Sequence, residues 1–517
     1  MDKYSFLNAA HTVYFAELYE KYKQDPDSIE PSWKAFFQGY DFGSETFGTN
    51  GEVIDGVTTQ VPEHVLKEFQ VIKLIDGYRT RGHLFTKTNP VRNRRKYAPT
   101  LDIENFGLDN SDLDTIFNAG DILGIGPQTL REIRKHLESI YCDSIGIEYM
   151  YIRQPQEIQW IQNKLNHNDN HGDFSINEKK HILRKLNEAV SFENFLHTKY
   201  VGQKRFSLEG NESLIPALDA LIEKAASYGV KEFVMGMAHR GRLNTLTNIF
   251  GKSPRDIFSE FDGKDYEEEV FDGDVKYHLG WTSDRLTDNG NRINLNIAPN
   301  PSHLEAVGAV VEGITRAKQD QYYSDDFSKV LPIVVHGDAA IAGQGLIYEV
   351  IQMANLDGYK TGGTVHIVVN NQIGFTTNYL DGRSSTYCTD VGKVTLSPVL
   401  HVNADDVEAV VHACRFALDF RMEFKRDVFI DLLGYRKYGH NEGDEPRFTQ
   451  PKLYKSISKH KNPRDIYADL LISEGIINAD YIKSLEKDYK NSLESELEDS
   501  RKQDKTVITP FMQKDWL

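Results

Sequence analysis

The amino-acid sequence predicts an α/β protein in which a parallel, helix-flanked sheet follows a helical N-terminal region. The first observation behind this prediction is an alternation between residues 201 and 450, where short apolar runs are followed by amphipathic segments. Such alternation is typical of parallel strands joined by helices. The second observation is that apolar residues before this region recur at the spacing of a helix face.

The same patterns divide the chain into successive segments. We expect, in order, a short helical segment, a linker rich in Gly, Thr and Ser, a helical domain, the α/β domain and a charged helical segment: 1–40, 41–61, 62–200, 201–450 and 451–517. The strands expected in the α/β domain are KEFVMGM, LPIVV, TVHIVVN, PVLHVN and VFIDLLGYR. Ligands of parallel α/β sheets bind beyond the carboxyl ends of the strands, so residues just after these runs are the first candidates for a functional site.

Composition and charge limit the classes of function. The 517 residues are 39% hydrophobic and 26% charged, which is typical of a soluble globular protein. A formal net charge of −17 argues against a nucleic-acid-binding protein, and the longest apolar runs are too short to span a membrane. The basic run RNRRK at 92–96 is either a solvated loop or a site for anions. Three widely spaced cysteines suit a reducing compartment, so we expect a cytoplasmic protein.

Polar side chains follow two successive strands of the predicted sheet. Asp338 comes after LPIVV, and Asn371 follows TVHIVVN. Because right-handed crossovers bring the ends of parallel strands to one edge, we expect the two side chains to lie close together. Carboxylate and amide oxygens are ligands that Mg²⁺ prefers, and nearby glycines allow backbone N–H groups to approach phosphate. An Asp at an ordinary strand-to-helix turn is the alternative, but the matched pair favours a magnesium-bridged diphosphate.

Two histidines lie beside the predicted edge. His239 ends the strand KEFVMGM, and His303 lies in the turn NPSHLEAV before a predicted helix. Each is either a proton-transferring or oxyanion-binding group, or a structural histidine with satisfied hydrogen bonds. The same two interpretations apply to His83 and His440. The arginines near them, Arg79, Arg81 and Arg436, are possible anion clamps.

Several motifs, taken in order, resemble the thiamine-diphosphate-dependent first component of the 2-oxoglutarate dehydrogenase complex. They are GMAHRGRLN, NPSHLEAV, GDAAIAGQG, NNQIGFTT, RSSTYCTD, HVNADD and GHNEGDEP. The resemblance extends over nearly the whole chain. It implies that Asp338, Asn371 and the backbone carbonyl of Ile373 bind Mg²⁺ beside the diphosphate of thiamine diphosphate, with Gly337 and Ala339 also at the cofactor.

The resemblance also implies an activity and partners. His239 and His303 would be active-site histidines that handle the 2-oxo acid, and His83 would lie in or near the substrate pocket. The implied reaction is the oxidative decarboxylation of 2-oxoglutarate in the tricarboxylic acid cycle. The succinyl group is passed to a lipoyl group of dihydrolipoyl succinyltransferase, on whose core residues 1–40 would dock. The implied oligomer is a homodimer.

The sequence departs from the family in two respects. Gly308-Ala309 and Ser385-Thr386 replace more usual residues beside the implied site, so a related substrate such as 2-oxoadipate remains an alternative. Members of the family are also nearly twice as long, and their second catalytic domain carries the glutamate that activates the cofactor. We therefore expect this chain to hold the diphosphate half only. It is then either a dehydrogenase that needs the other half, a non-catalytic binding or assembly module, or, as a third alternative, a simple magnesium-dependent phosphate binder.

Overall fold

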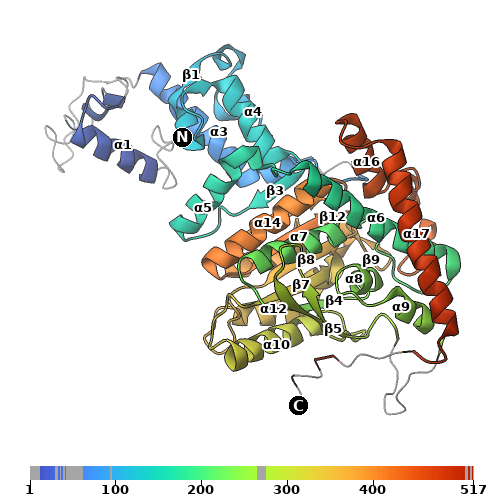
Figure 1. Ribbon diagram of the computed structural model, residues 1–517. Coiled ribbons are helices and arrows are strands. Elements are labelled where there is room, and N and C mark those ends of the chain that lie inside the picture. Colours follow the sequence, from blue (N-terminus) through green and yellow to red (C-terminus); the bar gives the residue numbers. More distant parts are fainter. Residues whose placement is uncertain are drawn as a thin grey trace. The chain divides into compact units, whose positions relative to one another are not determined.

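The computed structural model describes residues 12–29, 33–34, 36–38, 41, 62–92, 96–264, 275–506, 511–512 and 515. The chain divides into two compact units, the first made of residues 1–81 and 97–138 and the second of residues 82–96 and 139–517. Figure 1 shows the ribbon of each unit, coloured along the chain. No helix in the described parts of the chain is both long and apolar enough to cross a membrane.

Aromatic side chains pack the helices of the first unit. Helix α1 spans Thr12–Gln24 and helix α3 spans Glu63–Arg81. The buried side chains that join them are Tyr22, Trp33, Phe37, Val65 and Phe69. Each aromatic ring buries a large apolar area, so this cluster fixes the N-terminal helix on α3. Helix α1 lies within the segment expected to be helical, whereas residues 1–11 and the predicted linker, apart from Asp41, lie outside the described residues.

A buried carboxylate organises the rest of the first unit. Glu68 on α3 accepts hydrogen bonds from the backbone N–H groups of Asn118 (2.7 Å) and Ala119 (3.1 Å). These two amides begin a 3₁₀ helix and have no partners within it, so the carboxylate satisfies donors that burial would otherwise leave unpaired. The remaining elements are η3 (Ile103–Phe106), η4 (Asn110–Asp112), β1 (Ile116–Phe117), η5 (Asn118–Leu123), β2 (Gln128–Thr129) and the start of α4 (Leu130–Cys142).

An eight-stranded sheet forms the centre of the second unit. In spatial order its strands are β3 (Ile145–Glu148), β11 (Val399–Asn403), β12 (Val428–Leu433), β8 (Val365–Asn370), β7 (Val330–Gly337), β4 (Glu232–Met237), β6 (Arg292–Ile297) and β5 (Trp281–Leu286). The inner strands pair in parallel, and the two edge strands β3 and β5 pair antiparallel to their neighbours. The predicted fold class is therefore confirmed, with a parallel sheet that has antiparallel edges.

Apolar content explains which strands the sequence revealed. The predicted strands correspond to β4, β7, β8, β11 and β12, which are almost wholly buried and mainly apolar. The strands β3, β5 and β6 were not predicted. β5 is an edge strand without a fully buried residue, β6 is half polar, and β3 is only four residues long. None of the three provides the continuous apolar run by which a buried strand is recognised.

Helices cover both faces of the sheet. Figure 1 shows α7 (Leu214–Ser227) and α14 (Val407–Phe424) on one side, with α10 (Ala306–Tyr322) and α12 (Gly345–Met353) on the other. The other elements of this unit are η2 (Gly82–Phe85), α5 (Pro155–Asn166), η6 (His167–Asn170), α6 (Ile176–Lys199), α8 (Arg242–Asn248), α9 (Pro254–Phe261), α11 (Asp338–Gly343), β9 (Ile373–Gly374), β10 (Thr377–Asn378), α13 (Tyr379–Gly382), η7 (Cys388–Thr395), η8 (Pro446–Phe448), α15 (Pro451–Ile457), α16 (Pro463–Ser473) and α17 (Ala479–Lys502).

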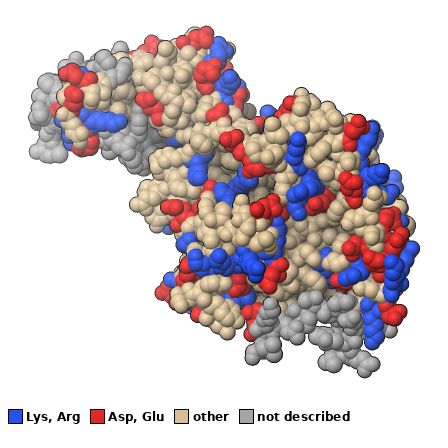
Figure 2. Space-filling model, in the orientation of Figure 1, with Lys and Arg blue, Asp and Glu red and all other residues tan. Residues whose placement is uncertain are grey.

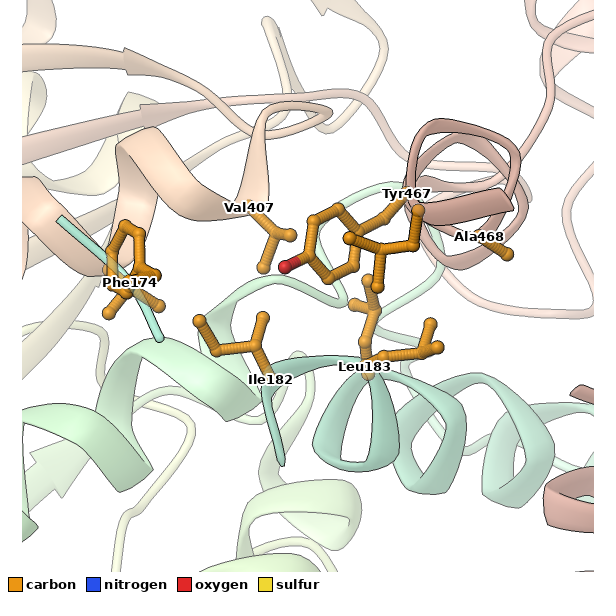
Figure 3. Close-up of a cluster of buried hydrophobic side chains, with 9 residues drawn as sticks. Phe174, Ile182, Leu183, Val407, Tyr467 and Ala468 are labelled. Carbon is orange, nitrogen blue, oxygen red and sulfur yellow. The ribbon is translucent and has the colours of Figure 1, made fainter. Parts of the chain in front are cut away.

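The C-terminal helices pack on the α/β core. Figure 3 shows side chains from α6, α14 and α16 pointing toward one another, including Leu183, Val407 and Tyr467. Full burial of each large apolar side chain stabilises the fold by about 2 kcal/mol. Helix α6 starts at a capping box in which Ser175 and Glu178 satisfy each other's backbone N–H groups. The cluster therefore joins segments more than two hundred residues apart.

The described surface is mixed in charge. On the face visible in Figure 2, acidic and basic side chains are interspersed over the larger unit. Many of these residues form exposed ion pairs, such as Lys461 with Asp469. Pairs of this kind contribute little to stability because solvent screens them. Exposed ion pairs therefore do not indicate a functional site, and the buried charged residues are the better candidates.

Candidate cofactor site at the carboxyl ends of the parallel strands

The ends of β7 and β8 bring the predicted carboxylate and amide together. The two strands are neighbours, and Gly337 pairs with Val369 in the parallel register. Asp338 and Asn371 therefore follow adjacent strand ends, and the backbone N–H of Asn371 donates to the Asp338 carboxylate. Both residues line one cavity of about 110 Å³, together with Gly337, Ala339 and Ile373. The expected proximity of Asp338 and Asn371 is thus present in the structure.

The negative charge of the buried Asp338 carboxylate is only partly balanced by neighbouring groups. The residue is 2% exposed, and burial raises its pKa to about 6. The Arg383 guanidinium, 3.9 Å away, lowers the pKa, but the nearby Asp431 carboxylate raises it. A buried carboxylate in this state gains stability from a bound cation, because the cation offsets the lost hydration of the charge.

The loop after β8 has an unusual backbone. Gln372 and Phe375 have positive φ values of 68° and 53°, in the left-handed region that most residues avoid. Asn371 Oδ1 accepts a hydrogen bond from the backbone N–H of Ile373, and Gln372 Nε2 donates to the carbonyl of Gly434. A Cβ atom on Gly374 would lie 2.6 Å from that of Ala339, so glycine allows this loop to approach the segment carrying Asp338.

The donor atoms at this edge fit magnesium better than a transition metal. Within the described parts of the chain, no cluster of three or more His, Cys, Asp or Glu side chains is placed to hold a metal ion. The cavity instead offers the Asp338 carboxylate and the amide and carbonyl oxygens of Asn371 and Ile373. Hard oxygen donors in small number, with positions left for water and phosphate oxygens, are the typical magnesium environment.

His239 lies in the same cavity as a neutral imidazole. Burial and the positive charge of Arg240 lower its pKa to about 3. Its ring packs against that of Phe206, with centroids 4.1 Å apart. At neutral pH this histidine therefore offers one hydrogen-bond donor and one acceptor, and carries no charge.

Two arginines supply positive charge at the cavity. Arg240 donates to the carbonyls of Ser207 (2.9 Å) and His440 (2.7 Å). Arg436 donates to the carbonyl of Phe375 (2.6 Å) and to the Tyr454 hydroxyl (3.1 Å). Because neither arginine is paired with a carboxylate by these bonds, their charge is available to an anion in the cavity.

The two arginines differ in how far the sequence revealed them. Arg436 was among the candidate anion clamps, and it lines the cavity, as does His440. Arg240 was not singled out, although its position directly after His239 in the motif AHRGRLN placed it at the same strand end.

The other predicted site residues lie elsewhere. His303 is exposed, and its neighbour Leu304 lines the cavity instead. His83 is 8% exposed, with Nδ1 2.9 Å from the Tyr387 hydroxyl and Nε2 3.6 Å from Glu148, among residues outside the cavity lining. Neither His83 nor His303 is among the residues that line this cavity. Their proposed roles stay predictions.

Hydrogen bonds connect the start of the basic run and the residues just before it to the segment that follows β8. Arg92, the first residue of the basic run, donates to Asn378 Oδ1 (3.1 Å), and Asn89 donates to Gln372 Oε1 (2.9 Å). Residues 93–95 of this run lie outside the described residues. Arg79 and Arg81 belong to the first unit, where Arg79 donates to the carbonyl of Ile122.

Two family models and several known proteins match this sequence. The family model of the dehydrogenase E1 component matches residues 184–508, and that of the 2-oxoglutarate dehydrogenase N-terminus matches residues 4–44. The chain is 44% identical over 509 residues to the 2-oxoglutarate dehydrogenase E1 component of Azotobacter vinelandii, covering 95% of this chain and 54% of the relative.

Two further relatives give the same result. The proteins of the same name from Cupriavidus necator and Haemophilus influenzae are 44% and 42% identical, again over 95% of this chain and 54% of theirs. The chain thus spans about half the length of the curated relatives it matches. The matched family model covers every strand of the eight-stranded sheet except β3, the loop after β8 and every residue of the cavity lining. The chain belongs to the dehydrogenase E1 component family.

Proposed function

We propose that this chain provides the cofactor-diphosphate half of a 2-oxoglutarate dehydrogenase. The reaction is the oxidative decarboxylation of 2-oxoglutarate with transfer of the succinyl group to a lipoyl group. The observation that carries the proposal is the buried Asp338 carboxylate at the end of β7, held beside Asn371 in a cavity with Arg240 and Arg436. Family membership supports thiamine diphosphate as cofactor, and the names of the relatives support the substrate.

The residues that would hold the cofactor and metal lie at one edge of the sheet. Asp338, Asn371 and the carbonyl of Ile373 would bind Mg²⁺, and the backbone at Gly337 and Ala339 would contact the diphosphate. When bound, thiamine diphosphate supplies the electron sink that makes decarboxylation of a 2-oxo acid possible. The protein's task is to place charge, exclude water and orient the reacting groups.

The side chains of the cavity suit that task. Arg240 and Arg436 are held by backbone carbonyls, so their positive charge is fixed in place before an anion arrives. His239 is neutral at working pH and can donate a hydrogen bond to an oxygen that gains negative charge, or accept a proton from it. The Phe206 ring contacts His239 in a tilted arrangement and adds apolar surface on one side of it.

The test of this proposal is carbon dioxide release from 2-oxoglutarate with thiamine diphosphate, Mg²⁺ and an artificial electron acceptor. The chain is assayed alone and mixed with the remaining half of the Azotobacter vinelandii relative. In the mixture we expect carbon dioxide release, and Asp338→Ala should abolish it. Asp381→Ala alters an exposed carboxylate on α13 near the same loop and should leave the release unchanged. Equal activity of the Asp338→Ala protein would contradict the proposed site.

The same assay distinguishes 2-oxoadipate from 2-oxoglutarate as the substrate, and an enzyme from a non-catalytic module. If 2-oxoadipate is decarboxylated with a higher kcat/KM than 2-oxoglutarate, the substrate assignment is wrong while the site stands. A folded chain that binds thiamine diphosphate but shows no release in either arm indicates a binding or assembly module. These outcomes are distinct because binding and turnover are measured on the same samples.

The partners follow from the family in the same way. The match of residues 4–44 to the 2-oxoglutarate dehydrogenase N-terminus supports docking of this segment on a lipoyl-bearing dihydrolipoyl succinyltransferase. Removal of residues 1–40 should abolish co-sedimentation with the transferase core and leave binding of Mg²⁺ and thiamine diphosphate intact. A homodimer and a cytoplasmic location complete the proposal, and the buried Cys388 and Cys414 thiols, which form no disulfide, are compatible with a reducing compartment.

A further inference from the structure

A row of buried charged side chains crosses the sheet beside the loop that follows β8. Asp431 on β12, His401 on β11 and Glu148 on β3 are 1%, 0% and 7% exposed. His401 Nδ1 is 2.8 Å from Asp431 Oδ2, and His401 Nε2 is 2.9 Å from Glu148 Oε1. The row thus joins three adjacent strands, and Lys393 pairs with its far end at Glu148.

The charges of this row are fixed by its hydrogen bonds. Both ring nitrogens of His401 face carboxylate oxygens, which accept hydrogen bonds and do not donate them. His401 must therefore carry a proton on each nitrogen, as an imidazolium. Burial alone would lower the pKa of His401, but the two carboxylates raise it above its ordinary value. The central cation in turn keeps the flanking carboxylates ionised, and it holds the pKa of Glu148 at about 2 against the effect of burial.

One end of the row holds the loop. The second oxygen of Asp431, Oδ1, accepts a hydrogen bond from Asn370 Nδ2 (2.8 Å). Asn370 Oδ1 accepts in turn from the backbone N–H of Gln372 (3.0 Å). Gln372 is the residue with a positive φ of 68°, and it lies between Asn371 and Ile373. Asp431 is therefore connected through one side chain to the strained peptide between the two loop residues of the cavity.

We propose that Asp431, oriented by the His401 imidazolium, is a positioning residue that holds the Asn370–Ile373 loop in the conformation that binds the metal. This inference rests on the proposed magnesium site and extends it to a residue that does not reach the cavity. The chain of contacts runs from His401 to Asp431, to Asn370 and to the Gln372 peptide. Its effect is to fix the direction of the Asn371 side chain and of the Ile373 carbonyl.

Energetically, the buried charges are better explained by positioning of the loop than by stabilisation of the fold. Bringing charges into the centre of a sheet costs desolvation energy, and replacing such groups by apolar side chains is often neutral for stability. A directed acceptor for Asn370 is what an apolar residue at position 431 would not supply. Backbone strain of the kind found at Gln372 persists only when surrounding contacts hold it. Removing the acceptor should therefore release the loop.

The experiment compares two substitutions at position 431. Asp431→Leu fills similar space and removes both acceptors, whereas Asp431→Asn keeps one acceptor oxygen for Asn370. The first readout is the dissociation constant of Mg²⁺ in the presence of thiamine diphosphate, measured by calorimetry. The second is hydrogen exchange of the Gln372 and Ile373 amides without metal or cofactor. The third is the melting temperature.

We expect Asp431→Leu to weaken Mg²⁺ binding by about tenfold to a hundredfold, the usual effect of losing a group that orients a metal ligand. It should also speed exchange at Gln372 and Ile373, and Asp431→Asn should restore both. The matched control is Glu260→Leu, because Glu260 and Lys252 form a remote buried pair at 2.6 Å with side chains 2% and 3% exposed. The control should lower the melting temperature and leave both other readouts unchanged.

The outcomes separate this inference from the proposed function. If Asp431→Leu folds and keeps wild-type Mg²⁺ affinity and loop exchange, Asp431 is not a positioning residue. If the wild-type chain shows no Mg²⁺-dependent cofactor binding, the proposed function fails, and the exchange measurement on the metal-free protein still decides whether Asp431 holds the loop. If Asp431→Leu does not fold, Asn370→Ala removes the same link, and unchanged loop exchange in that variant overturns the inference.

Discussion

Nη1 of Arg383 lies 3.9 Å from Oδ2 of Asp338, with the two side chains 11% and 3% exposed. The distance exceeds that of a hydrogen bond, so the arginine acts on the carboxylate mainly through its charge. Nε of Arg383 is also buried and has no hydrogen-bond partner among the described residues. The pair is therefore incomplete on both sides: the carboxylate lacks a cation within hydrogen-bond distance, and Nε of the guanidinium lacks an acceptor, among the described residues. A metal-bound diphosphate would supply both.

The first prediction concerns the pH dependence of stability without metal. Burial raises the pKa of Asp338 from 3.8 to about 6, so the folded state binds a proton that the unfolded state has released in this range. The stabilising contribution of Asp338 is therefore complete below pH 4 and is lost as pH rises through 6, at about 1.4 kcal/mol per pH unit. Asp338→Asn should remove this loss, which denaturant unfolding between pH 4 and 7 would measure.

The expected difference has a definite sign. At pH 7 the metal-free Asp338→Asn protein should be more stable than wild type by up to about 3 kcal/mol. Saturating Mg²⁺ and thiamine diphosphate should reverse the order, since ligand binding stabilises only the protein that binds. A variant less stable than wild type at pH 7 without metal would show that the Asp338 carboxylate is better compensated than its environment indicates.

The second prediction concerns Arg383. Arg383→Met removes the positive charge beside Asp338 and keeps a side chain of similar length, so the pKa of Asp338 should rise further, by about one unit. The pH at which wild-type stability stops falling should shift upward by the same amount in the unfolding series. Arg383→Lys, which keeps the charge, is the control and should stay close to wild type. Coincident pH profiles for Arg383→Met and wild type would mean that Arg383 does not act on Asp338.

The strand ends are the part of the site that sequence reasoning predicted. Asp338 and Asn371 each follow an apolar run, and parallel pairing of consecutive strands is enough to bring them to one edge. His239 was found for the same reason, at the end of β4. These predictions needed only local patterns and one rule of chain topology.

The buried row of Asp431, His401 and Glu148 was not predictable in that way. His401 and Glu148 are 253 residues apart, and they meet because β3 joins the sheet as an antiparallel edge strand. The sequence of β3, IGIE, is too short to be recognised as a strand, and it lies in a segment expected to be mainly helical. Arg383 likewise reaches Asp338 from a loop with no regular structure of its own. Contacts of this kind depend on the folded arrangement of distant segments.

The third prediction tests the positive charge of the cavity. Arg436 makes its bonds to the Phe375 carbonyl and the Tyr454 hydroxyl through different nitrogens, and a lysine side chain cannot reproduce that planar arrangement. Arg436→Lys should weaken binding of thiamine diphosphate or raise the KM for 2-oxoglutarate by about tenfold, the effect expected from losing one charge-assisted hydrogen bond. Arg447→Lys, at an arginine whose side chain is 72% exposed, should change neither value.

The split between the two constants identifies the ligand of Arg436. A change confined to cofactor binding would assign the arginine to the diphosphate, whereas a change confined to KM would assign it to a substrate carboxylate. If Arg436→Lys leaves both constants at the wild-type value, Arg436 holds the Phe375 loop and does not attract an anion.

The fourth prediction concerns Glu212, a buried acid near the same end of the sheet. It is 1% exposed, and burial together with the charge of Glu209 raises its pKa to about 8. Glu212 is thus protonated in the folded protein at neutral pH, and the stability it provides is lost as pH rises toward 8, at about 1.4 kcal/mol per pH unit above its unfolded pKa. Glu212→Gln mimics the protonated acid, so its free energy of unfolding should exceed that of wild type at pH 8.

An acid whose pKa is lowered, and not raised, provides the control for Glu212. Glu445 has a pKa lowered to about 2, chiefly by its hydrogen bond with Arg447, and both groups keep their charge at any pH used here. Glu445→Gln should therefore have the same effect on stability at pH 6 and at pH 8, whereas the advantage of Glu212→Gln should grow by about 2 kcal/mol over that interval. Parallel unfolding curves for Glu212→Gln and wild type would show that Glu212 is already ionised in the folded protein. In that case the buried Arg205, which pairs with Glu209, would have to compensate both carboxylates.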